Sequence, residues 1–509
     1  MKSIYSLVVV LWLALVVSPV VATDYYIESQ ADFDNLKQAT FSAGDNIFFQ
    51  KGKRFKGMFA PKGKGEKGAP IRIGSIGKGD RPRIDVQGKE QAGIFLQNPS
   101  FWEVDGLEIT NTNGSDEDQG QLFGIRVLAT VDKGRKHKWD KMDRREKRRR
   151  REESEGVFEH VYITNCYIHD INGKVAGKRR GGIHVHMAGL KKSIFHDLRI
   201  TNNRVENVGG VGIGNDSQAA EIIFHENSYE TKNLWTDVYV ADNFIDRTGR
   251  NGIIARASKD AIYECNIVAN SSRYDTGHSI FCFATDGIKI QYNEAYGNVG
   301  EGNKDRGGFD GDYSCVNTFI QYNYSHDNLW FCGIMKRSNR HVVIRYNLSV
   351  NDHKGIYFYG FNSNVESEDI HIYNNTHFIS KKYQACVFPN GRTPINSLFE
   401  NNVFYFEGGG TWGKEKTGPG VKFHNNKYVG ITPHPSDSSP VEGRLRFRSP
   451  GKTPQDIDLR SMKELLGYRL RKKSAGIEAG KKIKDSGGLT FEKKKVSLTK
   501  PHIGALGSK

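Results

Sequence analysis

The sequence is poor in cysteine, and the few cysteines follow no metal-binding spacing. Six occur in 509 residues, at positions 166, 265, 282, 315, 332 and 386, and none belongs to a CxxC pair. Zinc fingers and CxxC redox motifs are therefore excluded. Most of these cysteines fall in apolar, strand-like stretches. We therefore predict small buried side chains, although an exported protein could also form a disulfide.

Long hydrophobic runs are missing after the first residues of the chain. Met1-Lys2 is followed by an apolar run to about Val17 and then by the small residues Val20-Val21-Ala22. This pattern predicts a secretory signal peptide over residues 1–22, because the run is short for a membrane span. We expect a secreted or periplasmic protein that has no membrane span after the signal is cleaved.

Acidic residues are outnumbered: 58 of them face 74 lysines and arginines, which gives a formal charge of +16. Much of the excess lies in one basic block, residues 133–151, and lysines are dense again after residue 470. We interpret the block as a solvated loop insertion over residues 132–155, with a patch for acidic or sulfated polysaccharide as the alternative. No nucleic-acid-binding motif accompanies the charge, so nucleic acid is not an expected partner.

Helical periodicity is absent from the central part of the chain, where a strand pattern that ends in asparagine recurs instead. The recurring residues are Asn111, Asn165, Asn203, Asn243, Asn266, Asn293, Asn323, Asn347, Asn375, Asn402 and Asn426. From Asn243 onward they are 23 to 30 residues apart. Strands of period 2 at such a step indicate a parallel β-helix. Asparagine tolerates the left-handed conformation of a sharp turn, and its amide can bond to the next coil as an asparagine ladder.

These repeats resemble the right-handed parallel β-helix superfamily of pectin-lyase-like, carbohydrate-active proteins. The tail, with Leu-Gly-Tyr-Arg-Leu, Gly-Ile-Glu-Ala-Gly and His-Ile-Gly-Ala-Leu, resembles the closing coil of bacterial members. The resemblance implies an all-β, right-handed parallel β-helix solenoid of about a dozen coils. We place an N-terminal cap and the first coils in residues 23–100, the repeats in 101–440, and a C-terminal closing segment in 441–509. Such folds host hydrolases, lyases, epimerases and binding proteins.

The strands that follow each Gly-Ile signal carry polar and aromatic residues at their second and fourth positions. If the first position points inward, the second and fourth point outward. The fourth positions are His186, Asp216, Arg256, Phe283, Asp312, Arg337 and Tyr359, and the second positions include His184, Asp310, Met335 and Tyr357. We predict that this strip binds substrate through His184, His186, Asp216, Arg256, Phe283, Arg337 and Tyr359, together with the loop residues His278 and Arg306.

The pair Asp310 and Asp312 is the predicted catalytic centre. Two residues at i and i+2 of a strand share one face, roughly 7 Å apart. An inverting glycosidase uses an acid and a base at about that separation. We therefore predict a glycoside hydrolase that acts on an anionic polysaccharide as a monomer without a cofactor or metal. Asp216 is an alternative partner, and a bulge could bring Lys336 from its inward position into the site.

Two alternatives remain open from the residues. A polysaccharide lyase would need a base such as Lys336 and a group that neutralises a uronate, either Arg256 and Arg337 or Ca²⁺ held by Asp310, Asp312 and Glu301. A non-catalytic carbohydrate-binding solenoid would use the same strip for binding alone. The acidic residues serve the first two mechanisms equally well.

Overall fold

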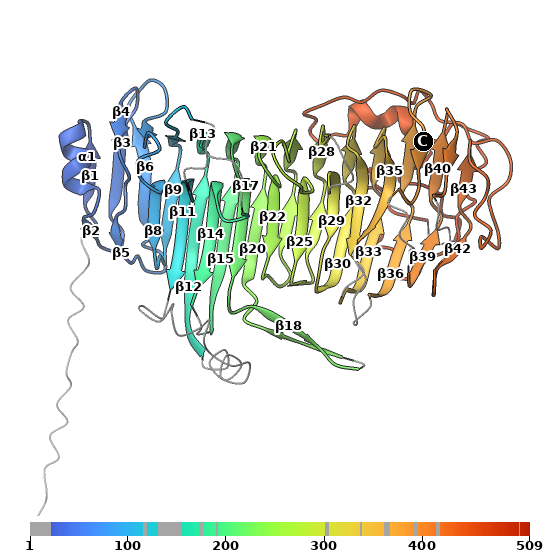
Figure 1. Ribbon diagram of the computed structural model, residues 1–509, viewed down its shortest axis with the longest axis horizontal. Helices are drawn as coiled ribbons and strands as arrows, with labels where there is room; N and C mark the ends of the chain where they lie inside the picture. Colours follow the sequence, from blue (N-terminus) through green and yellow to red (C-terminus); the bar gives the residue numbers. More distant parts are fainter. Residues whose placement is uncertain are drawn as a thin grey trace, which may run out of the picture.

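The protein is a right-handed parallel β-helix, as predicted (Figure 1). The computed structural model describes residues 22–115, 120–130, 154–172, 177–189, 192–226, 228–300, 305–335, 338–360, 367–389, 395–413, 418–497 and 499–508. Within these residues no helix is both long enough and apolar enough to span a membrane. Residues 1–21, the basic block, Glu301, Lys336 and Arg337 lie outside the described part, so the predictions made for them stay predictions.

Three long sheets form the walls of the helix. The first sheet contains, in order, β1 (Asp24–Ile27), β3 (Asn46–Gln50), β6 (Ile71–Ile76), β9 (Trp102–Asp105), β12 (Ser154–Thr164), β15 (Lys192–Thr201), β20 (Thr236–Ala241), β23 (Ile262–Glu264), β27 (Lys289–Gln291), β30 (Cys315–Gln321), β33 (Arg340–Arg345), β36 (Glu368–Tyr373), β39 (Ser397–Glu400) and β42 (Lys422–His424), and β26 (Thr285–Asp286) also pairs with β30.

The second sheet contains β4 (Arg54–Lys56), β7 (Arg83–Asp85), β10 (Glu108–Asn111), β13 (Tyr167–Ile171), β16 (Arg204–Val208), β21 (Phe244–Thr248), β24 (Ile267–Ala269), β28 (Glu294–Tyr296), β31 (Tyr324–His326), β34 (Leu348–Val350), β37 (Thr376–Ile379), β40 (Val403–Phe406) and β43 (Lys427–Val429). The third sheet contains β8 (Ala92–Gln97), β11 (Phe123–Thr130), β14 (Gly181–Ala188), β17 (Val211–Ser217), β22 (Ile253–Arg256), β25 (Ile280–Phe283), β29 (Gly307–Gly311), β32 (Trp330–Met335), β35 (Gly355–Gly360), β38 (Ala385–Cys386) and β41 (Gly410–Thr411).

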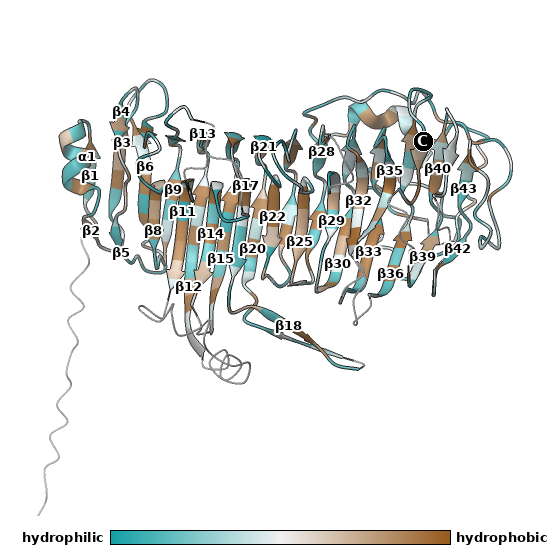
Figure 2. Cartoon of the chain, viewed as in Figure 1, coloured by the Kyte–Doolittle hydropathy of each residue, from teal (hydrophilic) through white to brown (hydrophobic). Residues whose placement is uncertain are grey.

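Alternation along the strands fills the interior with stacked apolar residues. Figure 2 shows hydrophobic and hydrophilic positions alternating along many strands. In the third sheet, Ile253 pairs with Ile280, which pairs with Phe309, and all three are fully buried. Each coil thus places a large apolar side chain directly on the one below. This continuous row is the core of the fold, because the hydrophobic effect stabilises stacked coils that no single coil could bury alone.

The predicted asparagine ladder is present at the turn between the first and second sheets, but it runs only from Asn203 to Asn426. In a typical step, Asn323 Nδ2 donates to Ile290 O at 2.9 Å and to Asn347 Oδ1 at 3.0 Å. The backbone N–H of Asn323 donates to the same Asn347 oxygen at 2.9 Å. Each ladder side chain therefore satisfies main-chain groups of a tight buried turn as well as its neighbour's amide.

Two details of the asparagine prediction are wrong. Asn111 is no ladder member, since it lies at the end of β10 and its Nδ2 donates to Glu90 O and Phe123 O. Asn165 occupies the left-handed position (φ 54°) that precedes the ladder site. In the later coils this left-handed position is taken by the residue before the ladder asparagine, such as Tyr322 (φ 56°). The ladder asparagines are therefore selected by hydrogen bonding rather than by backbone tolerance.

Both ends of the helix are covered. The helix α1 (Gln30–Leu36), within the predicted cap region 23–100, packs Phe33 on Phe55 with ring centroids 5.8 Å apart. At the other end, the His434 ring stacks on Phe423 at 4.0 Å. The short pairs β2 (Thr40–Phe41) with β5 (Lys62–Gly63), and β18 (Glu221–Phe224) with β19 (Tyr229–Lys232), lie outside the three walls.

Residues 441–508, here called the C-terminal strap, form no further coil. They run back along the outside of the second sheet and the asparagine turns (Figure 1). The strap contains one 3₁₀ helix, η1 (Lys463–Tyr468). Its Asp456 and Ile457 N–H groups donate to the Glu294 carboxylate at 3.1 and 2.8 Å. The strap is therefore fastened to coils far from the C-terminal end of the solenoid.

We expect Asn323→Ala to destabilise the fold by about 1–3 kcal/mol, because buried main-chain groups lose their partners. Chemical denaturation measures the change. Asn35→Ala, at an exposed position of α1, is the control and should leave stability nearly unchanged, since alanine favours helix. Equal stability of the Asn323 variant and the parent would contradict a structural role for the ladder.

Candidate active site

The outer face of the third sheet carries the predicted strip over five successive strands. The register pairs His186 with Asp216 and Arg256 with Phe283. One strand further, Asp310 pairs with Phe281, and the Asp312 N–H donates to Cys282 O at 3.1 Å. The predicted alignment of β14, β17, β22, β25 and β29 is therefore confirmed, and it places Asp312 next to Phe283.

The alignment of the next two strands is wrong. Cys332, and not Ile334, pairs with Phe309, and Tyr357 pairs with Cys332. Relative to Phe309, β32 is displaced by two residues, which keeps Ile334 in the core. Strand β35 is displaced by one residue, which moves every side chain to the opposite face. Tyr359 consequently lies in the core, where its hydroxyl contacts Ser397 Oγ at 2.8 Å, and it cannot line the outer strip. Tyr357 is likewise a core residue, and Phe358 takes the outward place.

Asp310 sits deepest in the strip, with 2% of its surface exposed. His278 Nε2 is 3.5 Å from Asp310 Oδ2, and His278 Nδ1 accepts a hydrogen bond from the Gly307 N–H at 3.0 Å. Since Nδ1 is an acceptor, the proton of a neutral imidazole lies on Nε2 and faces Asp310. His278 thus contacts a carboxyl group, whereas the sequence suggested only a contact with substrate.

A glycine makes room for this pair. Gly333 occupies the position next to Asp310 on β32, and a Cβ built on it would lie 2.5 Å from Asp310 Oδ1 and 3.0 Å from His278 Cε1. No side chain fits there without moving both groups. Asp310 Oδ1 and His278 Nε2 are buried and have no hydrogen-bond partner among the described residues. Buried polar atoms of this kind are expected where a ligand completes the bonding.

The two carboxyl groups share an environment that favours the protonated form. Burial, and then the charge of Asp312, raise the pKa of Asp310 well above its usual range. Burial raises the pKa of Asp312 to about 6, against the opposing effect of Lys178. Burial also lowers the pKa of His278 to about 4, so this imidazole is neutral at pH 7. Two interacting carboxyls titrate as a pair, and one of them can hold a proton near neutral pH.

Asp216 belongs to a different electrostatic setting. Its Oδ2 is 2.6 Å from Arg179 Nε, its Oδ1 is 3.3 Å from Arg256 Nη1, and His186 Nδ1 is 3.6 Å away. Burial would raise the pKa of Asp216, but Arg256, Arg179 and His186 together hold it below the usual value. Asp216 therefore stays ionised and orients cations, which disfavours it as the alternative acid.

The loop before β14 supplies two site residues that the sequence prediction missed. Lys178 Nζ lies 4.3 Å from the centre of the Phe281 ring, and Arg179 pairs with Asp216. Burial lowers the pKa of Lys178, and the charges of Asp312 and Asp310 oppose that shift. The run Gly177-Lys-Arg-Arg-Gly-Gly182 directly before a Gly-Ile strand was a usable signal.

Apolar side chains flank the carboxyl pair on both sides. Val211, Ile254, Phe281 and Phe283 form one cluster on the preceding coils. Leu329, Trp330, Phe358 and Tyr313 form another on the following coils. The ring centroids of Trp330 and Phe358 are 5.3 Å apart, and those of Phe283 and Tyr313 are 6.1 Å apart. Apolar walls around a few convergent polar groups are typical of small-molecule sites.

Two further predicted residues have clear structural surroundings. Arg306 Nη1 donates to Ser272 O at 2.7 Å and to Val299 O at 2.9 Å, so it ties neighbouring loops together. His184 is buried beside His186, and burial lowers its pKa to about 3.

In the described part of the chain, no group of three or more His, Cys, Asp or Glu side chains could hold a metal ion.

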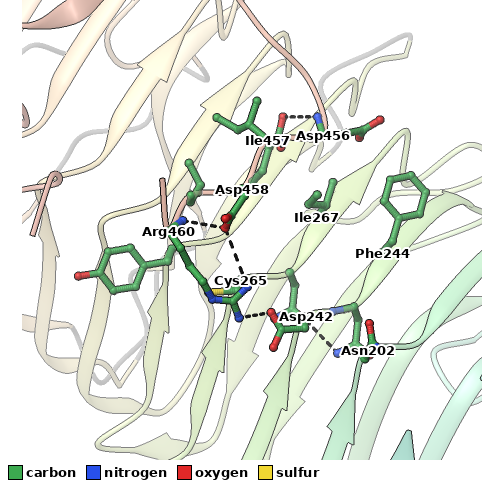
Figure 3. Close-up of a pocket in the computed structure, with 14 residues that line it drawn as sticks. Asn202, Asp242, Phe244, Cys265, Ile267, Asp456, Ile457, Asp458 and Arg460 are labelled. Atoms are coloured by element: carbon green, nitrogen blue, oxygen red, sulfur yellow. Dashed lines mark hydrogen bonds and ion pairs between the residues drawn. The ribbon is translucent and has the colours of Figure 1, made fainter. Parts of the chain in front are cut away.

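A cavity of about 280 Å³ lies elsewhere, between the strap and the turn that joins the first and second sheets (Figure 3). Arg460 pairs there with Asp242 and, at 3.9 Å, with Asp458. Cys265 is also part of the lining. The charged groups of this cavity fasten the strap to the coils, and none of them belongs to the strip.

Comparison with known proteins gives one curated relative and a structural likeness. No family model matches the sequence. A lacto-N-biosidase of Bifidobacterium longum subsp. longum is 25% identical over an alignment of 559 positions, which covers 91% of this chain and 34% of that protein. The chain thus spans about a third of the length of this relative. The crystal structure of a GH136 lacto-N-biosidase from Eubacterium ramulus superposes with a TM-score of 0.53 at 16% identity, over 81% of this chain and 68% of that one, and shares the fold.

The raised pKa of Asp312 makes a prediction about stability. Between about pH 4 and pH 6 the folded state binds the proton more tightly than the unfolded state, so ionisation removes stability as the pH rises. The Asp312→Asn variant does not lose this stability, because an asparagine side chain does not ionise. We expect its melting temperature, relative to the parent, to increase from pH 4 to pH 7. Asp80→Asn, at an exposed position, is the control and should show no such trend. A constant difference between the Asp312 variant and parent would contradict the raised pKa.

Proposed function

We propose that the protein is a carbohydrate-active enzyme, a glycoside hydrolase in which Asp310 and Asp312 form the catalytic pair. The observation that carries the proposal is the placement of both carboxyls on one coil, with raised pKa values, between two apolar clusters. The lacto-N-biosidase relative, aligned over 91% of this chain, supports glycoside hydrolysis as the reaction class.

The surroundings of the two carboxyls assign their roles. Asp310 is the more deeply buried and faces the neutral His278, so it is the group that keeps a proton at pH 7. Asp312 is half-buried near Lys178 and is mostly ionised at that pH. Asp310 then donates its proton to the leaving glycosidic oxygen, and Asp312 activates water or attacks the anomeric carbon. His278 acts as a positioning residue for the Asp310 carboxyl.

The substrate that fits best is an anionic polysaccharide. Lys178, Arg179 and Arg256 gather on the N-terminal side of the pair, and Asp216 compensates for only part of their charge. Arg256 also lies 4.9 Å from the centre of the Phe283 ring. A planar guanidinium next to an aromatic ring suits a sugar that carries a carboxylate or sulfate. The apolar cluster on the other side of the pair suits a neutral sugar face.

A second candidate reaction, β-elimination, rests on Lys178. Burial lowers the pKa of this amine, which lies close to the carboxyl pair, so its neutral form is easier to reach. A neutral amine could remove the proton next to a uronate carboxylate while Arg256 binds that carboxylate. Elimination yields an unsaturated product that absorbs ultraviolet light, whereas hydrolysis yields a reducing end without that absorbance.

The activity prediction concerns Asp310→Asn and Asp312→Asn. Each keeps the shape of the side chain but removes its proton chemistry, and we expect at least about a hundredfold loss of kcat. Plant and algal polysaccharides are the test substrates, with reducing ends and ultraviolet absorbance as readouts. Asp80→Asn should keep full activity. If both variants still turn over a substrate that the parent cleaves, the catalytic pair lies elsewhere.

The substrate prediction concerns the cations. We expect the double variant Lys178→Met, Arg179→Gln to raise KM for an anionic oligosaccharide by about tenfold. KM for the methyl ester of that oligosaccharide should stay unchanged, because the ester has no negative charge for these cations to contact. The exposed Lys259, replaced by Met, is the control and should alter neither value. Equal effects on the acid and the ester would contradict recognition of a negative charge.

A further inference from the structure

The C-terminal strap and Lys509 carry most of the excess positive charge of the chain. Residues 441–509 contain 18 lysines and arginines and 7 acidic residues, a net charge of +11 out of +16 for the whole protein. Most of these basic side chains are exposed. Arg460 and Lys481 form ion pairs that help to attach the strap to the coils. The remaining attachment rests on apolar residues such as Leu445, Phe447 and Phe491, so most of the basic side chains are not needed for it.

Part of this charge is organised on a short antiparallel ribbon. Phe447 pairs with Leu470. The Arg448 N–H donates to Arg469 O at 3.0 Å, and the Arg471 N–H donates to Arg446 O at 2.8 Å. Residues opposite each other in such a ladder point to the same face. Phe447 and Leu470 share the buried face, so the arginines on both sides of them share the outer face.

We call residues 444–448 and 469–473 the arginine ribbon. Its exposed cations are Arg444, Arg446, Arg448, Arg471, Lys472 and Lys473. The alternation with buried Leu445 and Phe447 fixes the direction of the first three. Neighbours on one edge of an extended chain are roughly 7 Å apart, and opposite residues are about 5 Å apart. The ribbon thus presents two adjacent rows of positive charge.

These charges repel one another within the folded protein. Arg446 lies opposite Arg471, and like charges in that position destabilise a ladder. Arg469 is compensated by an ion pair with Glu492. In the described part of the chain, the ion pairs of the strap involve Arg460, Arg469, Lys481, Lys494 and Lys500, and none involves Arg444, Arg446, Arg448 or Arg471. An anion that bridges the rows would relieve this repulsion.

The ribbon is separate from the candidate active site. Phe447 packs on Phe378 of β37 and on Tyr405 of β40, both in the second sheet. Asp310 and Asp312 lie on the outer face of the third sheet. Figure 1 shows the strap over the C-terminal part of the solenoid, and the Arg460–Asp242 ion pair extends its contacts to the coil of β21. A polymer on the ribbon would therefore leave the strip free.

We propose that the arginine ribbon binds a linear polysaccharide that carries sulfate or carboxylate groups and holds the protein on that polymer. Guanidinium groups bind both anions through paired N–H donors, and their regular spacing suits a chain with regularly spaced charges. This inference goes beyond the proposed hydrolysis, because it requires neither the carboxyl pair nor the third sheet. No nucleic-acid-binding motif accompanies the ribbon, which favours a carbohydrate polymer.

The test compares two variants of the full chain that lose the same charge. In the ribbon variant, Arg444, Arg446 and Arg448 are replaced by Gln. In the control, the exposed Lys53, Arg54 and Lys56 at the other end of the solenoid are replaced by Gln. Titration with dextran sulfate, polygalacturonate and neutral dextran gives Kd at low and moderate salt. Residues 133–151 are intact in both variants, so their contribution to binding is the same.

We expect the ribbon variant to bind one or both anionic polymers about tenfold more weakly, with a shallower salt dependence. Its melting temperature should be at least as high as that of the parent, because a repulsion is removed. Weaker binding of dextran sulfate would identify sulfate as the preferred group, and weaker binding of polygalacturonate would identify carboxylate. The control should bind like the parent, and neutral dextran should bind to neither. Equal loss of affinity in both variants, or an unchanged affinity in the ribbon variant, would overturn the proposal.

Two further measurements separate the possible outcomes. If the parent binds duplex DNA with a Kd as low as that for the polysaccharides, the proposal of a carbohydrate partner is wrong. Cleavage of a short soluble substrate should be the same in the ribbon variant and the parent, and a loss there would contradict a separate surface. If the parent cleaves no glycan but the ribbon variant still loses polymer affinity, the hydrolase is refuted and the ribbon is supported.

Discussion

The asparagine turn between the first and second sheets is the constraint on which the other features depend. In the coils from Asn203 to Asn426 the chain bends sharply there with its main chain buried. A buried N–H or C=O without a partner destabilises the fold by about 1–3 kcal/mol. Asn347 and its equivalents satisfy several such groups at once and bond to the next coil. The ladder therefore fixes the vertical alignment of the coils. Once that is fixed, residues at equivalent positions of successive coils must lie side by side.

The outer strip is a consequence of that alignment. His186, Asp216, Arg256, Phe283 and Asp312 are far apart in sequence, yet they meet because each occupies the same place in its coil. The strand alone would leave Asp310 as an ordinary exposed carboxyl. The loops between the second and third sheets bury it with His278 and Lys178, and that burial raises its pKa. The protein thus accepts an unfavourable buried acid at the position where proton transfer is useful.

The positive charges of the chain occupy two places that differ in kind. In the strip, Arg179 and Arg256 both form ion pairs with Asp216, which compensates for part of their charge and holds them in fixed positions. On the strap, the exposed arginines of the ribbon face solvent around a few apolar anchors. The first arrangement suits the recognition of one charged group, and the second suits a long flexible partner. The same side-chain chemistry therefore supports two different kinds of binding.

The alternation of apolar residues along strands and the repeated asparagine are properties of the sequence itself. They were enough to predict the parallel β-helix, the ladder in most coils and the alignment of the five strands from β14 to β29. Only the tertiary structure decided the rest. The inward position of Tyr359 depends on the register of β35 against β32, where Tyr359 and not Ile356 pairs with Ile334, and no local pattern sets that register. Lys178, Gly333 and the orientation of His278 come from loops and coils that meet only after stacking. The pKa values of Asp310 and Asp312 likewise depend on how deeply those neighbours bury them.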